Sequence, residues 1–174
     1  MKLKIVLVFS VVIVSLTFVA IAGDVEEYKL KFKGDGYFSM VFDEETGDLV
    51  SSPAGGFDLL NVSHLGLSKV VWELRLDPIT FEFRSGTFTI TGANGIDSLY
   101  GEYSYFVFTP DPENPYIGTY VLGWDFQGGT GKFEGATGIG HTDGLPDFVN
   151  LYAEFKFSGA VTVEIDDDDQ GEDD

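Results

Sequence analysis

From residue 28 onward the chain alternates apolar and polar side chains with the period of two that is typical of β-strands. In residues 28–42 the lysines stand at odd positions, and most large apolar side chains stand at even positions, namely Tyr28, Leu30, Phe32, Phe38, Met40 and Phe42. One face of this segment is therefore predicted to be buried and the other to be wet. Because the parity survives Gly34-Asp35-Gly36, the segment is either one long kinked strand or two strands in a hairpin.

Turn signals separate further strand-like runs. The alternation through Phe81 and Phe83 changes parity across Ser85-Gly86, which predicts a bulge or a turn there. Asn94-Gly95 lies between two strand-like runs and predicts a type I′ hairpin, in which both residues need a positive φ. The proline-rich segment 110–115 predicts another turn.

Helix signals are nearly absent after the first 22 residues. Strand-like runs punctuated by turns at intervals of about ten residues predict a β-sandwich or β-barrel, and about eight strands suffice to close a small barrel. We assign residues 23–165 to this single domain. Residues 166–174 carry almost only acidic side chains, cannot bury apolar surface, and are predicted to be a disordered tail.

The first 22 residues have the three parts of a secretory signal peptide. Lys2 and Lys4 precede an apolar run from Ile5 to Val19, and Ala20-Ile21-Ala22 is a small-x-small cleavage site. A retained anchor is disfavoured because the run is short for a spanning helix, which needs about 20 residues, and ends in a cleavage pattern. We expect a mature chain that starts at Gly23, is secreted or periplasmic, and has no membrane segment.

The composition is strongly acidic and contains no cysteine. The chain has 29 acidic and 10 basic residues, a formal net charge of −19, and loss of Lys2 and Lys4 with the signal leaves 8 basic residues and a charge of −21. This charge repels phosphates and argues against nucleic acids and anionic membranes as partners. An exported chain without cysteine has no disulfide and no lipid-anchor thiol, so its core alone must hold it together.

Residues 128–140 include six glycines but match no glycine-rich binding motif. A P-loop would need a hydroxyl side chain, and a calcium-binding repeat an aspartate, where Phe133 stands. A dinucleotide fingerprint would need glycine at Asp143. The prediction is a hairpin corner in which Phe133 fills the core. Its glycines permit left-handed turns and close approach of neighbouring side chains, and the positions concerned are Gly128, Gly129, Gly131 and Gly135.

Four short motifs together resemble a family of small exported bacterial β-barrels related to the allene oxide cyclases and dirigent proteins. They are SHLG at 63–66, TGANG at 91–95, LYGEY at 99–103 and GGTGKFEGATG at 128–138, and they include Ser63, Gly66, Asn94 and Gly95. The resemblance covers roughly residues 55–163, with Lys132 where the family usually has arginine. It implies a single eight-stranded antiparallel barrel of the calycin-like type, whose interior can hold a hydrophobic small molecule. By analogy only, it also implies a homo-oligomer. None of the plant cyclase's catalytic residues can be matched to this chain.

Five residues are candidates for ligand binding. His64 is either a polar group or general base inside the barrel, or a histidine that fixes strand register. Glu102 could do acid–base chemistry if it pointed inward, although charges on an outer barrel face are far commoner. Asn61, Tyr103 and Trp124 complete the set. Two histidines without a close acidic ligand predict no metal site, and no cofactor is expected.

Three functions remain open from the sequence. The first is a binding protein that holds a small apolar ligand inside the barrel, and the second is an isomerase or cyclase that confines an apolar substrate. The third is a filled barrel that acts through its loops, because closed barrels offer no sheet edge to a partner. An eight-stranded barrel lies at the border between filled and hollow, so strand number does not decide between them.

Overall fold

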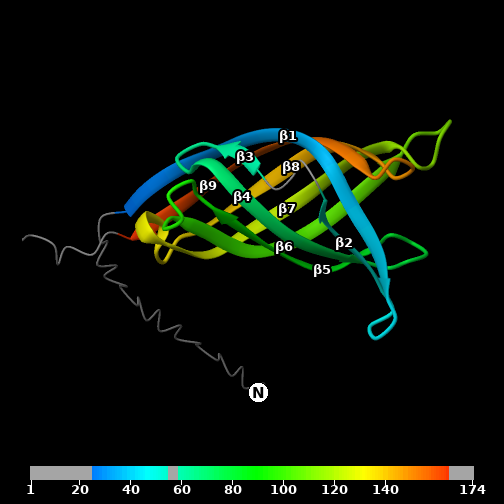
Figure 1. Cartoon of the computed structure of the whole chain (residues 1–174), viewed down its shortest axis with the longest axis horizontal. Helices are drawn as coiled ribbons and strands as arrows, with labels where there is room; N and C mark the ends of the chain where they lie inside the picture. Colours follow the sequence, from blue (N-terminus) through cyan, green and yellow to red (C-terminus); the bar gives the residue numbers. More distant parts are fainter. Residues whose placement is uncertain (1–24, 55–58, 165–174) are drawn as a thin grey trace, which may run out of the picture.

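The computed structural model of the chain describes residues 25–54 and 59–164, which form an all-β structure (Figure 1). The predicted signal peptide and the acidic tail lie outside these residues. The strands are β1 (Val25–Asp43), β2 (Asp48–Ala54), β3 (Leu59–Val62), β4 (Gly66–Leu76), β5 (Phe83–Thr91), β6 (Ser98–Pro110), β7 (Gly118–Thr130), β8 (Thr137–Asp147) and β9 (Tyr152–Glu164). A 3₁₀ turn, η1 (Gly131–Phe133), connects β7 to β8. The described part of the chain contains no helix of the length and apolarity needed to cross a membrane.

The strands form a closed eight-stranded antiparallel barrel with β3 as one additional strand outside it, which confirms the predicted fold class. Around the barrel the order is β2-β1-β9-β8-β7-β6-β5-β4. The barrel closes because β2 pairs back onto β4, with Leu49 opposite Leu76 and Ser51 opposite Leu74. Closure satisfies the backbone groups that an open sheet would leave at its two edges.

β3 pairs with the part of the β4 edge that β2 does not reach. It pairs with β4 from Leu59 to Val62. Ser63, directly after β3, joins this strand to β1: its N–H donates to the carbonyl of Lys31 at 3.1 Å, and its Oγ accepts the N–H of Lys31 at 2.7 Å. The two short strands therefore share the edge of β4, each at one end of the barrel.

β1 is one continuous strand, so the first of the two alternatives for residues 28–42 is correct. Its pairing with β9 runs without a break from Val25 to Tyr37. Glycine at position 34 has a packing reason, because a Cβ there would lie 2.5 Å from Cδ2 of Leu60 on β3. The absence of a side chain lets β1 pass close to β3 as it curves around the barrel.

The irregularity predicted near Ser85-Gly86 is a β-bulge. The register between β4 and β5 shifts between the pairs Arg75–Ser85 and Leu76–Phe83, so Arg84 is the extra residue. Phe81, which the alternation placed in a strand, instead lies in the β4–β5 loop with a φ of +58°. The Oδ1 atom of Asp77 accepts the N–H groups of Ile79 and Thr80, each at 2.9 Å, and this turn takes the place of the expected strand.

The hairpin predicted at Asn94-Gly95 is present between β5 and β6, but the prediction of a type I′ turn is wrong. Of the two residues only Gly95 has a positive φ, of +68°. The side-chain oxygen of Asn94 accepts the N–H groups of Ile96 and Asp97, each at 3.0 Å. This side-chain turn replaces the second left-handed residue, and the connection becomes a longer loop.

The glycine-rich corner closes one end of the barrel. Phe133 in η1 is fully buried, as predicted, and its ring meets that of Tyr28 edge-on with centroids 5.0 Å apart. Gly131 and Gly135 have φ values of +60° and +70°, which an L side chain rarely adopts. The corner therefore needs both its glycines and its one large apolar side chain.

Gly128 and Gly129 serve a different purpose from the predicted left-handed turn. Neither is among the residues with positive φ, and both lie in β7. A Cβ on Gly128 would collide with the ring of Tyr100, and a Cβ on Gly129 with the backbone of Phe133. They are glycines because neighbouring groups occupy the side-chain space.

The interior next to this corner is filled. Large side chains with almost no exposed surface occupy it, namely Leu30, Ile90, Leu99, Phe126, Phe157 and Val161. Phe32 stacks on Phe157 with ring centroids 4.4 Å apart. Packing of this density leaves no room for a second molecule at this end.

Candidate functional site in the barrel interior

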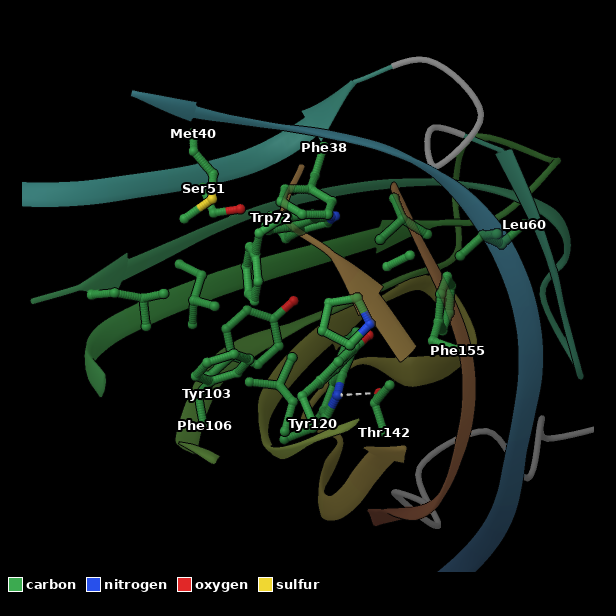
Figure 2. A pocket seen from close by; sticks show the side chains of 18 of the residues that line it. Phe38, Met40, Ser51, Leu60, Trp72, Tyr103, Phe106, Tyr120, Thr142 and Phe155 are labelled. Atoms are coloured by element: carbon green, nitrogen blue, oxygen red, sulfur yellow. Dashed lines mark hydrogen bonds between the residues drawn. The ribbon is translucent and has the colours of Figure 1, made fainter. Parts of the chain in front are cut away.

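The other end of the barrel is hollow. A cavity of about 90 Å³ lies there, walled mainly by apolar side chains of β1, β4, β6, β7 and β9. Figure 2 shows Tyr103, Phe106 and Tyr120 on one side of the cavity, with Phe38, Met40 and Ser51 opposite. No charged side chain of the described residues lines this space.

The size of the cavity limits what it can hold. A buried water needs roughly 10–15 Å³, whereas an apolar cavity of about 150 Å³ accommodates benzene. Most pockets for drug-sized ligands are larger, at about 300–1,000 Å³. A cavity of about 90 Å³ is smaller than the one that accommodates benzene, so it suits a short chain as it stands and a small ring when flexible wall residues such as Met40 move.

Few polar side chains reach the cavity, and one pair is already hydrogen-bonded. The indole Nε1–H of Trp124 donates to the hydroxyl of Thr142 at 2.8 Å, and both residues are buried. The hydroxyls of Tyr103 and Tyr120 differ from this pair, because within residues 25–54 and 59–164 neither has a hydrogen-bond partner. Figure 2 shows both tyrosine hydroxyls turned toward the middle of the cavity.

Two glycines make room for these tyrosines. A Cβ on Gly86 of β5 would lie 2.6 Å from Cδ2 of Tyr103, and a Cβ on Gly144 of β8 would collide with the ring of Tyr120. The Tyr103 ring is also held perpendicular to that of Trp124, with centroids 5.0 Å apart. The positions of both phenol rings are therefore determined by the strands beside them.

Both phenols stay protonated at neutral pH. Burial raises the pKa of Tyr103 well above its ordinary value, and neighbouring Tyr120 adds to the shift. Burial likewise raises the pKa of Tyr120, with a further contribution from Asp143. A neutral phenol donates one hydrogen bond, so each hydroxyl offers the cavity a donor.

An aromatic cluster lies at the cavity, where Phe38 and Phe148 are part of its wall. Phe148, from the β8–β9 loop, packs against Phe108 at 5.0 Å, Phe81 at 5.7 Å and Phe38 at 5.8 Å between ring centroids. The β8–β9 and β4–β5 loops come from opposite sides of the barrel, so the contact between Phe148 and Phe81 crosses the hollow end of the barrel. Phe81 and Leu151, one in each loop, both have a positive φ, which is unfavourable for such side chains.

Two of the five candidate residues lie at the cavity and three do not. Tyr103 and Trp124 line it. Glu102 is exposed on the outer face because it alternates with Tyr103 along β6, and Asn61 is exposed for the same reason beside buried Val62. His64 lies in the β3–β4 turn at the filled end with a φ of +68°, and its exposed ring contacts Tyr28.

Other cavity residues were missed by the sequence analysis. Tyr120 shares its parity with Leu122, Trp124 and Phe126 along β7, so the alternation would have placed it inside. The alternation of apolar and polar residues did not point to Ser51 or Phe148. The small size of Ser51 leaves space rather than filling it, and Phe148 lies in a loop where no alternation applies.

A second hollow, a groove of about 280 Å³, runs over the outside of β4 and β5. Its two arginines are already paired with carboxylates. Arg75 contacts Glu73 at 2.8 Å and Asp43 at 3.0 Å, whereas Arg84 contacts Asp77 at 2.7 Å and also Asp48. These ion pairs connect β4 and β5 to the β1–β2 hairpin and so support the seam where the barrel closes.

The described residues contain no cluster of three or more histidine or acidic side chains that could hold a metal ion. The chain matches no protein-family model, and comparison with curated proteins and with solved structures gives no match.

Proposed function

We propose that this protein binds a small apolar molecule in the hollow end of its barrel. The observation that carries the proposal is the cavity of about 90 Å³, whose apolar wall includes two tyrosine hydroxyls without a hydrogen-bond partner among the described residues. An apolar cavity with a few convergent polar groups is the usual form of a small-molecule site.

The cavity gives binding a physical driving force. Its wall atoms lack contacts on one side, and the cost of a void in a protein core is about 24 cal/mol per Å³. For a void of about 90 Å³ this amounts to roughly 2 kcal/mol, which an apolar ligand would recover by filling the space.

The predicted export and the resemblance to allene oxide cyclase and dirigent barrels are part of this proposal. Together they favour a carrier that works outside the cytoplasm and holds its ligand in the barrel. The strongly negative charge is consistent with a neutral ligand rather than a nucleic acid or an anionic surface.

Native mass spectrometry of the exported protein, purified without detergent, tests the proposal directly. We expect an additional mass that is lost on denaturation. Both tryptophans of the chain line the cavity, so a toluene titration followed by the indole N–H signals of Trp72 and Trp124 provides a second test. Absence of both a bound mass and a toluene-induced shift would overturn the proposal and direct attention to the loops.

A matched pair of variants locates the site. Ala153 on β9 is buried and lines the cavity, whereas Ala160 on the same strand lies on the outward-facing parity. Ala153→Leu should fill the cavity and abolish the toluene-induced shifts. Ala160→Leu should bind toluene as the wild type does. Thermal unfolding of both variants shows that each remains folded.

A further inference from the structure

Two tyrosine hydroxyls in the cavity wall can distinguish a polar ligand from an apolar one, which a purely apolar wall cannot do. Tyr103 is only 5 % exposed, and neither its hydroxyl nor that of Tyr120 is hydrogen-bonded to any described residue. No fully buried side-chain nitrogen or oxygen of the described residues lacks a hydrogen-bond partner, so these two hydroxyls open into the cavity. A ligand atom that accepts a hydrogen bond from them would gain an interaction that a purely apolar ligand could not make.

The position of both hydroxyls is built into the barrel. Gly86 and Gly144 leave the space that the two rings occupy, and the perpendicular contact with Trp124 holds the ring of Tyr103. The hydroxyls come from the neighbouring strands β6 and β7 and face the same cavity. Tyr120 is near enough to raise the pKa of Tyr103, and two neighbouring donors that face one cavity suit a single oxygen atom with two lone pairs.

The cavity disfavours an anionic ligand. Among the described residues, no lysine, arginine or histidine lines the cavity. An ionised carboxylate would have to lose its water without gaining a cation, which is costly in an apolar environment. The raised pKa values of both phenols keep them neutral donors rather than charged groups.

We infer that the ligand is a neutral apolar molecule with one oxygen acceptor, such as a carbonyl or ether, which receives hydrogen bonds from Tyr103 and Tyr120. This inference rests on the proposed function and specifies the ligand class for the same cavity. Tyr103 and Tyr120 are then the residues that distinguish an oxygenated ligand from a hydrocarbon of equal shape.

Two probes of nearly equal shape separate the inference from the proposed function. Cyclopentanone carries the oxygen acceptor, and methylenecyclopentane replaces it by a CH₂ group. Their dissociation constants are measured through the indole N–H signals of Trp72 and Trp124. Tyr103→Phe and Tyr120→Phe remove one donor each, and Tyr100→Phe, at an exposed position of β6, is the matched control.

We expect each cavity variant to raise the Kd of cyclopentanone about three- to tenfold, the usual effect of one lost hydrogen bond. The Kd of methylenecyclopentane should stay unchanged in both, and Tyr100→Phe should alter neither probe. Because the lost hydroxyls have no partner within residues 25–54 and 59–164, both cavity variants should unfold at the wild-type temperature or above it.

Equal binding of both probes to the wild type, unaffected by either cavity variant, would overturn the inference and leave the binding function intact. Binding of cyclopentanecarboxylate as tight as that of cyclopentanone would also overturn it. If neither neutral probe nor toluene binds the wild type, the proposed function itself fails.

Discussion

The division of the barrel into a filled end and a hollow end can be tested by removing the same side chain at each end. Phe133 has no exposed surface and lies in the filled corner. Phe106 is half-buried and lines the cavity. Phe133→Ala creates a new void among side chains that are already in contact, whereas Phe106→Ala enlarges a space that already exists.

The expected free energies differ accordingly. Truncation of a fully buried phenylalanine costs about 3–5 kcal/mol. Loss of the partial burial of Phe106 should cost about 1–2 kcal/mol, because fewer contacts are removed. With a urea m-value of about 2 kcal/mol per molar, the midpoint should fall by about 2 M for Phe133→Ala and by less than about 1 M for Phe106→Ala.

Urea unfolding followed by tryptophan emission measures both changes, since both tryptophans lie in the barrel wall. Equal destabilisation by the two substitutions, or a larger effect of Phe106→Ala, would refute the division into two ends. The m-values must agree with that of the wild type, because a changed slope would indicate that the unfolded or native state has altered.

Two further predictions concern single hydrogen-bonded groups. Thr142→Val should destabilise the protein by about 1–3 kcal/mol in the same urea assay, because it leaves the buried indole N–H of Trp124 without an acceptor. Thr46 and Arg75 hold the pKa of Asp43 at about 2, against about 3.9 in an unfolded chain. The stabilisation by Asp43 should be complete above about pH 4 and lost toward pH 2, so the wild type should unfold at a higher temperature than Asp43→Asn at pH 6 and not at pH 2. A difference that persists at pH 2 would contradict this assignment.

The period of two along the chain determined which side chains enter the barrel and which face water. Tyr103 and Glu102 are neighbours in sequence, yet one lines the cavity and the other is exposed, as their opposite parity requires. The same pattern, with its turn signals, predicted an all-β sandwich or barrel and the position of the β5–β6 hairpin, and the family resemblance implied the barrel. The burial of Phe133 also followed from its place in the glycine-rich corner.

Local backbone detail escaped the sequence because side chains compete with the backbone for hydrogen bonds. Asn94 uses its side-chain oxygen to form the turn and so does not need the left-handed conformation that Asn-Gly usually adopts. Both interpretations of His64 assumed a position within the sheet, and only the pairing of β3 with β4 shows that it lies in the turn between them. The backbone conformation at both residues depends on where the neighbouring strands end.

Whether the interior is filled or hollow was decided by the tertiary structure alone. The alternation along a strand predicts that a side chain points inward. The free volume inside the barrel depends on how the side chains of all strands pack against one another. Ser51 and Tyr103 are far apart in sequence and face one cavity only because β2 closes onto β4. The sequence therefore determined the wall of the barrel, and the convergence of distant strands determined the cavity within it.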